Sequence, residues 1–243
     1  MVRTVLAPLR TLIVVIVGPI ITILCGTFVI LFGRWIPGVV RPTMRVWGWV
    51  VARTAGLSWN VEGLDHIDRE RSYVVVSNHL SNLDPPLHLA ILPLRVSLLA
   101  KKELFRIPLF GTAMRSARIV ETDRQAHAGA HRAINEQVKK VVERKISLMI
   151  YPEGTRSRDG EMRPFKKGAF RIATDNDLPV LPVTISGTRE AWPAGSRLIR
   201  GGKVRVVVHP PVETADLDTA GDLTELRDRV QTMMQDTYEA IRR

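Results

Sequence analysis

Two short blocks of polar residues have the residue types and spacing needed for acid–base and phosphate chemistry. The first places His79 five residues before Asp84, and the second, later in the chain, brings Glu153 close to Arg156. An imidazole beside a carboxylate can take a proton from a hydroxyl group, and a guanidinium binds phosphate through its planar set of donors. In this order, the two blocks predict acyl transfer onto an alcohol that carries a phosphate.

The first block follows a strand-like run, Tyr73 to Ser77, so His79 is expected beyond the carboxyl end of a strand, where open α/β sheets bind ligands. On one continuous helix, residues five apart would point about 140° away from each other. Asp84 precedes Pro85, and a carboxylate at the N-cap with proline at the first helical position is a common helix start. We therefore predict a loop that folds His79 back onto Asp84, which fixes the tautomer and leaves one ring nitrogen as the general base.

The second block begins where another strand is predicted to end, because the apolar run Ser147 to Tyr151 is closed by Pro152. Arg156 offers a fork of donors suited to a phosphate. Glu153 can accept a hydrogen bond from a substrate hydroxyl or hold Arg156 in place. Gly154 lets the backbone approach a ligand closely, and the amides near it are one hypothesis for the donors that stabilise an oxyanion.

Two other kinds of catalysis fit the sequence less well. Ser81 lies close to His79, and a Ser-His-Asp set would also transfer acyl groups. The chain has no G-x-S-x-G elbow, however, which marks such a nucleophile. It also has no H-E-x-x-H, paired-cysteine or calcium-loop pattern, so no metal site is expected. The single cysteine, Cys25, excludes an internal disulfide.

Beyond residue 55, short β-branched runs alternate with longer helical stretches, which is typical of an α/β domain. The helical spacing of apolar residues is clearest at residues 125–144 and 223–241, and both segments are expected to lie as helices against a sheet. The predicted strands are Trp59–Glu62, Tyr73–Ser77, Ser97–Ala100, Ser147–Tyr151, Val180–Ile185 and Val204–Val208.

The stretch from Thr11 to Gly33 contains no charged residue. As a straight helix it would run about 34 Å, enough to cross a hydrocarbon core of about 30 Å. A secretory signal fits less well, because the apolar run is long and no small-residue cleavage site follows it. Gly18-Pro19 would kink the helix or break it into a hairpin, so spanning and re-entrant insertion both stay open. We predict a membrane-anchoring segment at residues 1–54 and a catalytic domain at residues 55–243.

The formal net charge of +11 fits nucleic acid, an anionic membrane surface or a phosphorylated substrate. The apolar segment favours the membrane, and no zinc pattern or aromatic-rich RNA-binding signature is present, so no nucleic-acid partner is expected. Four arginines follow the segment and two precede it, which places the catalytic domain on the cytoplasmic side of the cell membrane. The four are Arg34, Arg41, Arg45 and Arg53, and Trp35, Trp47 and Trp49 among them are expected at headgroup depth or in the domain core.

The sequence resembles the glycerolipid acyltransferase superfamily, in particular its 1-acyl-glycerol-3-phosphate acyltransferases. The N-H-x-S-x-x-D block of that family matches Asn78 to Asp84, and its P-E-G-T-R-S block matches Pro152 to Ser157. A block that ends in an Asp-Arg pair matches Asp123-Arg124, and a proline-bearing apolar strand matches Leu178 to Val183. The blocks occur in the order typical of the family.

The resemblance implies a single domain with a mixed α/β sheet flanked by helices, together with an N-terminal apolar anchoring helix or helical hairpin. It implies His79 as the general base and Asp84 as its partner. The substrate-binding residues that it implies are Arg124, Glu153, Gly154, Thr155 and Arg156.

The reaction implied is transfer of a fatty acyl group from a thioester donor to the free hydroxyl of lysophosphatidate, at the glycerol 2-position, which gives phosphatidate for phospholipid synthesis. No cofactor is implied, and acyl-coenzyme A and acyl carrier protein are both suitable donors. Another lysophospholipid or glycerol phosphate as the acceptor, and a catalytically inactive membrane-anchored scaffold, remain alternatives.

Overall fold

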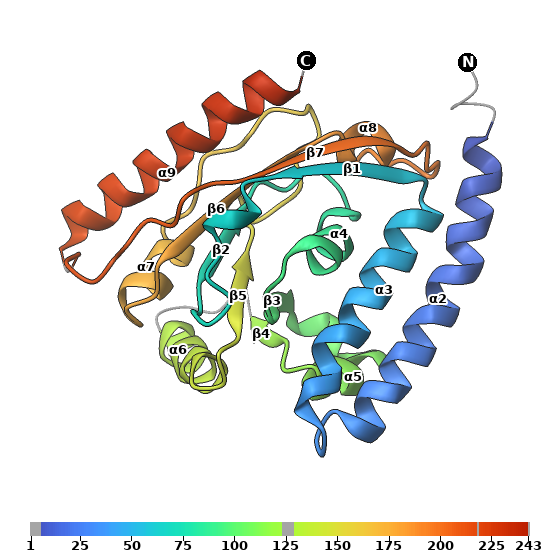
Figure 1. Cartoon of the computed structure of the whole chain (residues 1–243), viewed down its shortest axis with the longest axis horizontal. Coiled ribbons are helices and arrows are strands. Elements are labelled where there is room, and N and C mark those ends of the chain that lie inside the picture. Colours follow the sequence, from blue (N-terminus) through green and yellow to red (C-terminus); the bar gives the residue numbers. More distant parts are fainter. Residues whose placement is uncertain (1–5, 123–128, 218, 243) are drawn as a thin grey trace.

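The fold is built on one twisted sheet with helices on both faces (Figure 1). The computed structural model describes residues 6–122, 129–217 and 219–242. Within these ranges the sheet has seven strands in the order β1-β7-β6-β2-β5-β3-β4. The strands are β1 (Leu57–Glu62), β2 (Val74–Ser77), β3 (Val96–Lys101), β4 (Val120–Thr122), β5 (Ser147–Ile150), β6 (Val180–Ser186) and β7 (Gly202–Val208).

The sheet is mixed, as the resemblance implied. Strands β6 and β7 pair antiparallel, and the other neighbouring pairs among these strands are parallel. All residues of β2, β5 and β6 are buried, which is expected for central strands covered on both faces. Because β2 and β5 are parallel neighbours, the two polar blocks that follow them emerge side by side at the same edge of the sheet.

Helices cover the two faces in separate groups. One face packs against α6, α7 and α9, and the other packs against α3, α4 and α8. Side chains of β2 alternate between the two cores: Val74 and Val76 face the first group, whereas Val75 faces the second. The helices are α2 (Ala7–Phe32), α3 (Val40–Thr54), α4 (Asp84–Ile91), α5 (Phe110–Ser116), α6 (Gly129–Val142), α7 (Gly168–Thr174), α8 (Thr188–Ala191) and α9 (Ala220–Ile241).

The N-terminal part forms a helical hairpin, but the turn is not at Gly18-Pro19. Helix α2 runs without interruption through Pro19, and the chain reverses at residues 33–39 to form α3, which lies antiparallel to α2 (Figure 1). Gly48 brings α3 close to α4, because a Cβ atom there would lie 2.2 Å from the carbonyl oxygen of Pro86. The hairpin is therefore packed tightly onto the helix that carries Asp84.

Helix α2 lies against the folded domain along its length. Near its start, the Arg10 guanidinium donates to the carbonyl of Arg200, and the Thr11 hydroxyl accepts from the amide of Ile199 at 2.9 Å. Further along, the Thr22 hydroxyl accepts from the indole nitrogen of Trp47 at 2.9 Å. These contacts hold one side of α2 to the protein while its other side stays outward.

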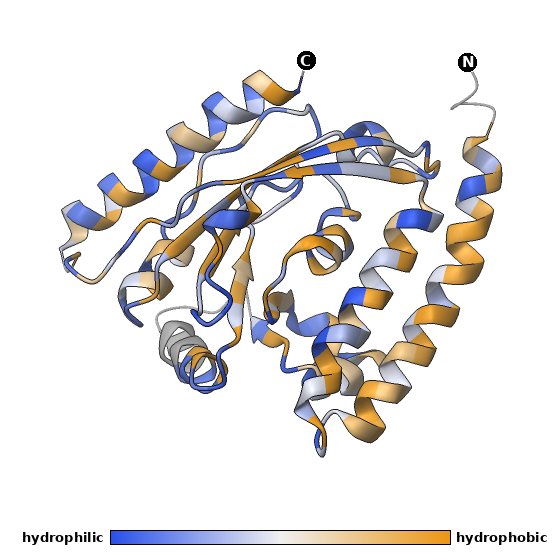
Figure 2. Ribbon diagram, viewed as in Figure 1, coloured by the Kyte–Doolittle hydropathy of each residue, from blue (hydrophilic) through white to orange (hydrophobic). Residues whose placement is uncertain are grey.

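The outward side of α2 is apolar and uncovered. Figure 2 shows α2 coloured as hydrophobic over most of its length, and its large exposed side chains are aliphatic or aromatic. In the described ranges α2 is the one helix that is long and apolar enough to cross a bilayer, and most of it is not buried in the protein. Exposed apolar side chains on it include Leu9, Leu12, Val15, Ile16, Ile20, Ile23, Leu24, Phe28, Leu31 and Phe32.

The six predicted strands are confirmed, with ends that differ by one or two residues. Strand β4 was not predicted, because three residues carry no alternating pattern. The three tryptophans of this region differ in exposure. Trp35 is 78% exposed beyond α2 and Trp49 is half exposed, whereas Trp47 turns inward and donates to Thr22.

Candidate active site

His79 and Asp84 meet as predicted. Imidazole Nδ1 of His79 lies 2.8 Å from Oδ2 of Asp84. The Asp84 side chain is fully buried, and 17% of the His79 side chain is exposed. Because a carboxylate only accepts hydrogen bonds, Nδ1 carries the proton and Nε2 has its lone pair free to take one.

Asp84 also shapes the loop that precedes it. Its Oδ2 accepts hydrogen bonds from the backbone amides of Leu80 and Ser81, each at 2.7 Å. The N-cap of α4 is Leu83, so the prediction of Asp84 at the N-cap was off by one position. As the first residue of the helix, the carboxylate turns back toward the loop and closes it around His79.

Glu153 joins the two polar blocks. Its Oε1 accepts from the amide of His79 at 2.8 Å, and its Oε2 accepts from the amide of Arg163 at 3.1 Å. Burial raises the pKa of Glu153 to about 7. No ion pair joins Glu153 to Arg156 in the described ranges, so the first of these side chains holds the loop of His79 and does not hold the guanidinium.

Two further contacts fix the loop of His79. The amide of Ser157 donates to the carbonyl of His79 at 2.8 Å. The side chain of Asn78 pairs with Ile185 of β6, with Nδ2 donating to its carbonyl at 2.9 Å and Oδ1 accepting from its amide at 2.8 Å. The side chain of Asn78 and the carbonyl of His79 therefore both form hydrogen bonds to other elements, so the backbone of His79 has little freedom.

Tyr151 supports the imidazole from one side. Its ring stacks on that of His79 with centroids 4.1 Å apart, and its hydroxyl lies 3.1 Å from Nδ1 of His88. His88 is fully buried, and burial lowers its pKa to about 4, so it is neutral. Its Nδ1 also lies 2.8 Å from the carbonyl oxygen of Asp84, an acceptor, so this nitrogen carries the proton.

Ser81 does not face His79 as a nucleophile would. Its hydroxyl donates to the carbonyl of Trp192 at 2.8 Å and accepts from the amide of Leu83 at 3.3 Å. The side chain is fully buried. These contacts give Ser81 a structural role in the loop and favour direct attack by a substrate hydroxyl.

The other residues predicted to bind substrate differ in exposure and in their contacts. Thr155 is exposed and Arg156 half-buried, and both line the same cavity as His79. Gly154 has φ +75°, and its amide donates to the carbonyl of Tyr151 at 3.0 Å, so this amide is not an uncommitted oxyanion donor. Arg124 lies outside the described residues.

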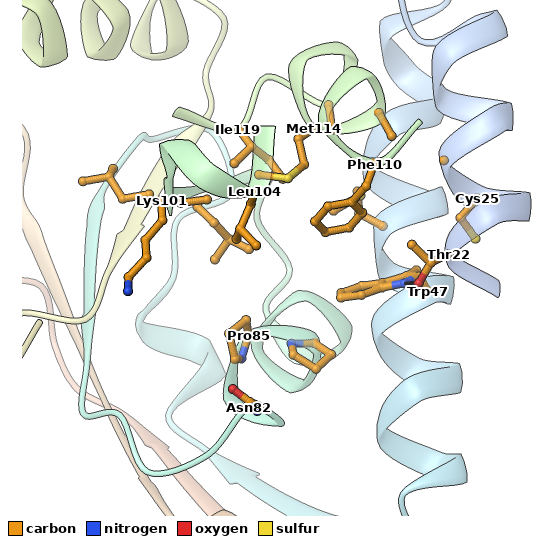
Figure 3. A pocket seen from close by; sticks show the side chains of 18 of the residues that line it. Thr22, Cys25, Trp47, Asn82, Pro85, Lys101, Leu104, Phe110, Met114 and Ile119 are labelled. Carbon is orange, nitrogen blue, oxygen red and sulfur yellow. Dashed lines mark hydrogen bonds between the residues drawn. The ribbon is translucent and has the colours of Figure 1, made fainter. Parts of the chain in front are cut away.

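The cavity has a volume of about 570 Å³ and runs from His79 to the N-terminal hairpin. Most of its wall is apolar, and α2 and α3 supply part of it. Figure 3 shows Trp47 from α3 and Phe110 from α5 directed into the space, with Thr22 and Cys25 of α2 beyond them. The space is therefore mostly apolar, with His79, Lys101 and Arg156 as the basic groups in its wall.

The described ranges hold no group of three or more metal-ligating side chains. Together, a tautomer-fixed imidazole, a nearby guanidinium and an apolar cavity suit proton removal from an amphiphilic substrate.

Comparison with known proteins agrees with this chemistry. The sequence profile of the family described as "Acyltransferase" matches residues 58–186, which include both polar blocks. The chain belongs to the acyltransferase family.

Named relatives in this acyltransferase family are identical to the chain at about a third of the aligned positions. The 1-acyl-sn-glycerol-3-phosphate acyltransferase of Limnanthes douglasii is 34% identical over 169 residues, which is 70% of this chain and 59% of the relative. The human 1-acyl-sn-glycerol-3-phosphate acyltransferase alpha is 33% identical over 186 residues, which is 76% of this chain and 65% of the relative. The matched part thus spans less than two thirds of these curated relatives.

A solved acyltransferase structure matches almost the whole chain. The 1-acyl-sn-glycerophosphate acyltransferase PlsC from Thermotoga maritima superposes with a TM-score of 0.84 and 28% sequence identity, covering 98% of this chain and 97% of that one. The similarity therefore extends through the N-terminal hairpin as well as the sheet.

Sequence reasoning missed the residues that support His79 from behind. Tyr151 was treated as the end of a strand and His88 was not considered. Asn78 was noted as part of the first block without a role. The available signal was that Asn78 begins the first block and Tyr151 directly precedes the second. The contacts themselves could not be predicted, because they depend on the order of β2, β5 and β6 in the sheet.

Proposed function

We propose that the protein transfers a fatty acyl group from a thioester donor to the free hydroxyl of lysophosphatidate, at the glycerol 2-position, and so forms phosphatidate. The observation that carries this proposal is the single cavity that His79 shares with Arg156 and with the apolar walls of α2 and α3. A base, a phosphate ligand and room for a hydrocarbon chain occur in one space.

The reaction needs one proton acceptor and no covalent enzyme intermediate. Nε2 of His79 takes the proton of the acceptor hydroxyl as that oxygen attacks the carbonyl carbon of the thioester. The carbon–sulfur bond then breaks, an ester remains, and the thiolate takes the proton back from the imidazolium. Asp84 stabilises the imidazolium through its 2.8 Å contact with Nδ1 of His79.

The acceptor phosphate is assigned to Arg156, which can form two parallel hydrogen bonds to it. Arg124 is proposed as a second ligand on the basis of the sequence match alone. Because Arg156 and His79 line one cavity, a phosphate held by the first would keep the acceptor hydroxyl close to the second.

The donor is proposed to be acyl-coenzyme A or acyl carrier protein, since each delivers a thioester, and no cofactor is required. The apolar part of the cavity suits the acyl chain. Its volume of about 570 Å³ lies within the range of about 300–1,000 Å³ typical of small-molecule sites.

The protein is proposed to bind the membrane through the outer face of α2. One side of α2 is held to the rest of the protein by contacts at Arg10, Thr11 and Thr22, so a perpendicular crossing would take the domain into the bilayer with it. If α2 lies in the membrane interface with its exposed apolar side in the lipid, it keeps its contacts with the protein and buries its apolar side chains. The cell membrane, with the domain on the cytoplasmic side, remains our prediction for its location.

The test is transfer of labelled acyl groups from acyl-coenzyme A to lysophosphatidate in detergent or liposomes. His79→Ala should lower kcat by about 10²–10⁴-fold, with the melting temperature retained. Ser81→Ala is the matched control, and it should keep activity within about 10-fold, because its hydroxyl only holds the loop. No product from the intact protein with either donor and a panel of lysolipids would favour an inactive scaffold.

A further inference from the structure

A second cluster of charged side chains lies at the opposite edge of the sheet from His79. Arg41 comes from the first turn of α3, Arg95 precedes β3, and Arg118 lies between α5 and β4. Their side chains line one small pocket, called here the arginine pocket. Since β3 runs parallel to β2 in the sheet, a group before β3 and a group after β2 lie at opposite edges.

Within the described residues, the three arginines have no carboxylate partner. All are half-buried, and no carboxylate in the described part of the chain lies within ion-pair distance of them. Glu70, a carboxylate at this edge, is bound to Lys145 at 2.8 Å. Burial, followed by repulsion from other arginines, lowers the pKa of Arg41 and of Arg118. The arginines that act on them are Arg45, Arg69, Arg95 and Arg144.

The backbone holds one of the three in an uncommon conformation. Arg118 has φ +61°, in the left-handed region that non-glycine residues seldom adopt. The buried hydroxyl of Ser97 donates to the carbonyl of Arg118 at 2.7 Å and fixes it there. Such a conformation persists only where surrounding contacts enforce it, so the position of Arg118 is set by β3 and not by chance on a loose loop.

The pocket adjoins the part of the molecule expected in the lipid. Met44 and Ala117 line both the arginine pocket and the larger apolar cavity. Arg41 follows the turn between α2 and α3, where Trp35 is 78% exposed and Ile36 is also exposed. Cationic side chains beside exposed aromatic and aliphatic ones are the usual arrangement at the level of lipid headgroups.

The size of the pocket limits what can enter. Its volume of about 30 Å³ corresponds to about two water-sized groups, so up to two oxygens of one phosphate can enter while the rest of the group stays at the mouth, and an acyl chain does not fit. We propose that the arginine pocket binds the phosphate of an anionic membrane phospholipid, at a site separate from the catalytic cavity. This inference rests on the membrane contact proposed for α2 but does not require acyl transfer.

The decisive experiment is sedimentation with liposomes of phosphatidylcholine, with and without phosphatidylglycerol. The variant Arg41→Gln/Arg95→Gln/Arg118→Gln should keep its binding to neutral liposomes. The increase in binding that phosphatidylglycerol causes should be at least about 10-fold smaller for this variant than for the intact protein. The matched control Arg171→Gln/Arg205→Gln/Arg229→Gln removes the same charge from exposed positions elsewhere and should lose about 2-fold. Equal losses in the two variants would show a mere net-charge effect and overturn the proposal.

Two further arms separate the alternatives. Arg95 also donates to the carbonyl of Arg144 at 3.2 Å, so Arg41→Gln/Arg118→Gln, which keeps that bond, decides the result if the triple variant does not fold. Inorganic phosphate should not raise the melting temperature of the intact protein in neutral detergent. A rise that the triple variant loses would assign the pocket to soluble phosphate and overturn the lipid assignment.

Activity distinguishes this site from the catalytic one. In neutral detergent micelles the triple variant should transfer acyl groups within about 2-fold of the intact protein, because none of the three arginines lines the catalytic cavity and distant charges are screened by salt. A loss comparable to that of His79→Ala would merge the two sites and overturn the inference. If the intact protein shows no transfer, the proposed function fails while liposome binding still decides the role of the pocket.

Discussion

Charged side chains at the two edges of the sheet differ in whether they have partners within the protein. At the carboxyl edge, Asp84 and Glu153 are buried, and backbone amides of the neighbouring loops donate to both. At the amino edge, Arg41, Arg95 and Arg118 are half-buried and have no internal carboxylate in the described ranges. Carboxylates that are hydrogen-bonded within the protein can position a catalytic group by themselves. Arginines without a carboxylate partner in the protein must be neutralised by an external anion or hydrated by solvent.

After His79→Ala, the largest effect is expected from Asp84→Asn. An asparagine oxygen can still accept from the amides of Leu80 and Ser81, so the loop should stay closed, but the negative charge that stabilises the imidazolium of His79 is lost. We expect kcat to fall by about 10²–10³-fold with little change in KM. Steady-state kinetics at saturating donor measures it.

The double variant Asp84→Asn/His79→Ala provides the control. Since Asp84 acts through His79, the double variant should be no slower than His79→Ala alone. A multiplicative loss would mean that Asp84 contributes to catalysis independently of the imidazole.

Glu153→Gln tests the second buried carboxylate through the pH dependence of stability. Burial raises the pKa of Glu153 from 4.5 to about 7 in the folded state, so folding favours the protonated form. Its contribution to stability is complete below about pH 4.5 and is lost as pH rises through about 7. Relative to the variant, the intact protein should therefore lose about 2–3 kcal/mol between about pH 5 and pH 8.

Urea unfolding in detergent at several pH values gives the comparison. His88 changes the free energy of unfolding with pH in the opposite direction, because its pKa is lowered to about 4 in the folded state and stability falls as pH drops below about 6.5. This contribution is the same in the intact protein and in the variant. A difference between them that stays constant with pH would refute the assignment to Glu153.

Tyr151→Phe should have a smaller effect. The ring that stacks on His79 is kept, and only the hydroxyl near His88 is removed. Because His88 still donates to the carbonyl of Asp84, no buried donor is left without a partner, and we expect about 1 kcal/mol of destabilisation. Tyr151→Leu, which removes the stacked ring, should also shift the pH profile of kcat/KM, and an unchanged profile would limit Tyr151 to packing.

The smallest effect is expected from Arg41→Gln at the amino edge. Removing one of several mutually repelling charges should leave the free energy of unfolding unchanged or raise it by at most about 0.5 kcal/mol. Thermal unfolding in neutral detergent suffices. A clear destabilisation would show that Arg41 has an internal structural role, and the contrast between the two edges would be lost.

Much of the fold was predictable because the central strands are short, apolar and bounded by turn residues. The runs at Val74–Ser77 and Ser147–Ile150 are buried on both faces, so their composition alone marks them. The position of the hairpin turn was not predictable from Gly18-Pro19, because the helix continues through Pro19 and the chain reverses only at residues 33–39. Strand β4 depends on pairing with β3, and its three residues specify little by themselves.

For the site, the sequence alone determined the pair His79 and Asp84. The two residues are only five apart and a helix starts at the second, so a short loop brings their side chains together. It also identified Glu153 and Arg156 as polar groups at the end of a strand. Only the tertiary structure decided that Glu153 binds the loop of His79 and leaves Arg156 free of it. That choice depends on β2 lying next to β5, a contact between segments far apart in the chain, and local patterns of residues do not encode the order of strands in a sheet.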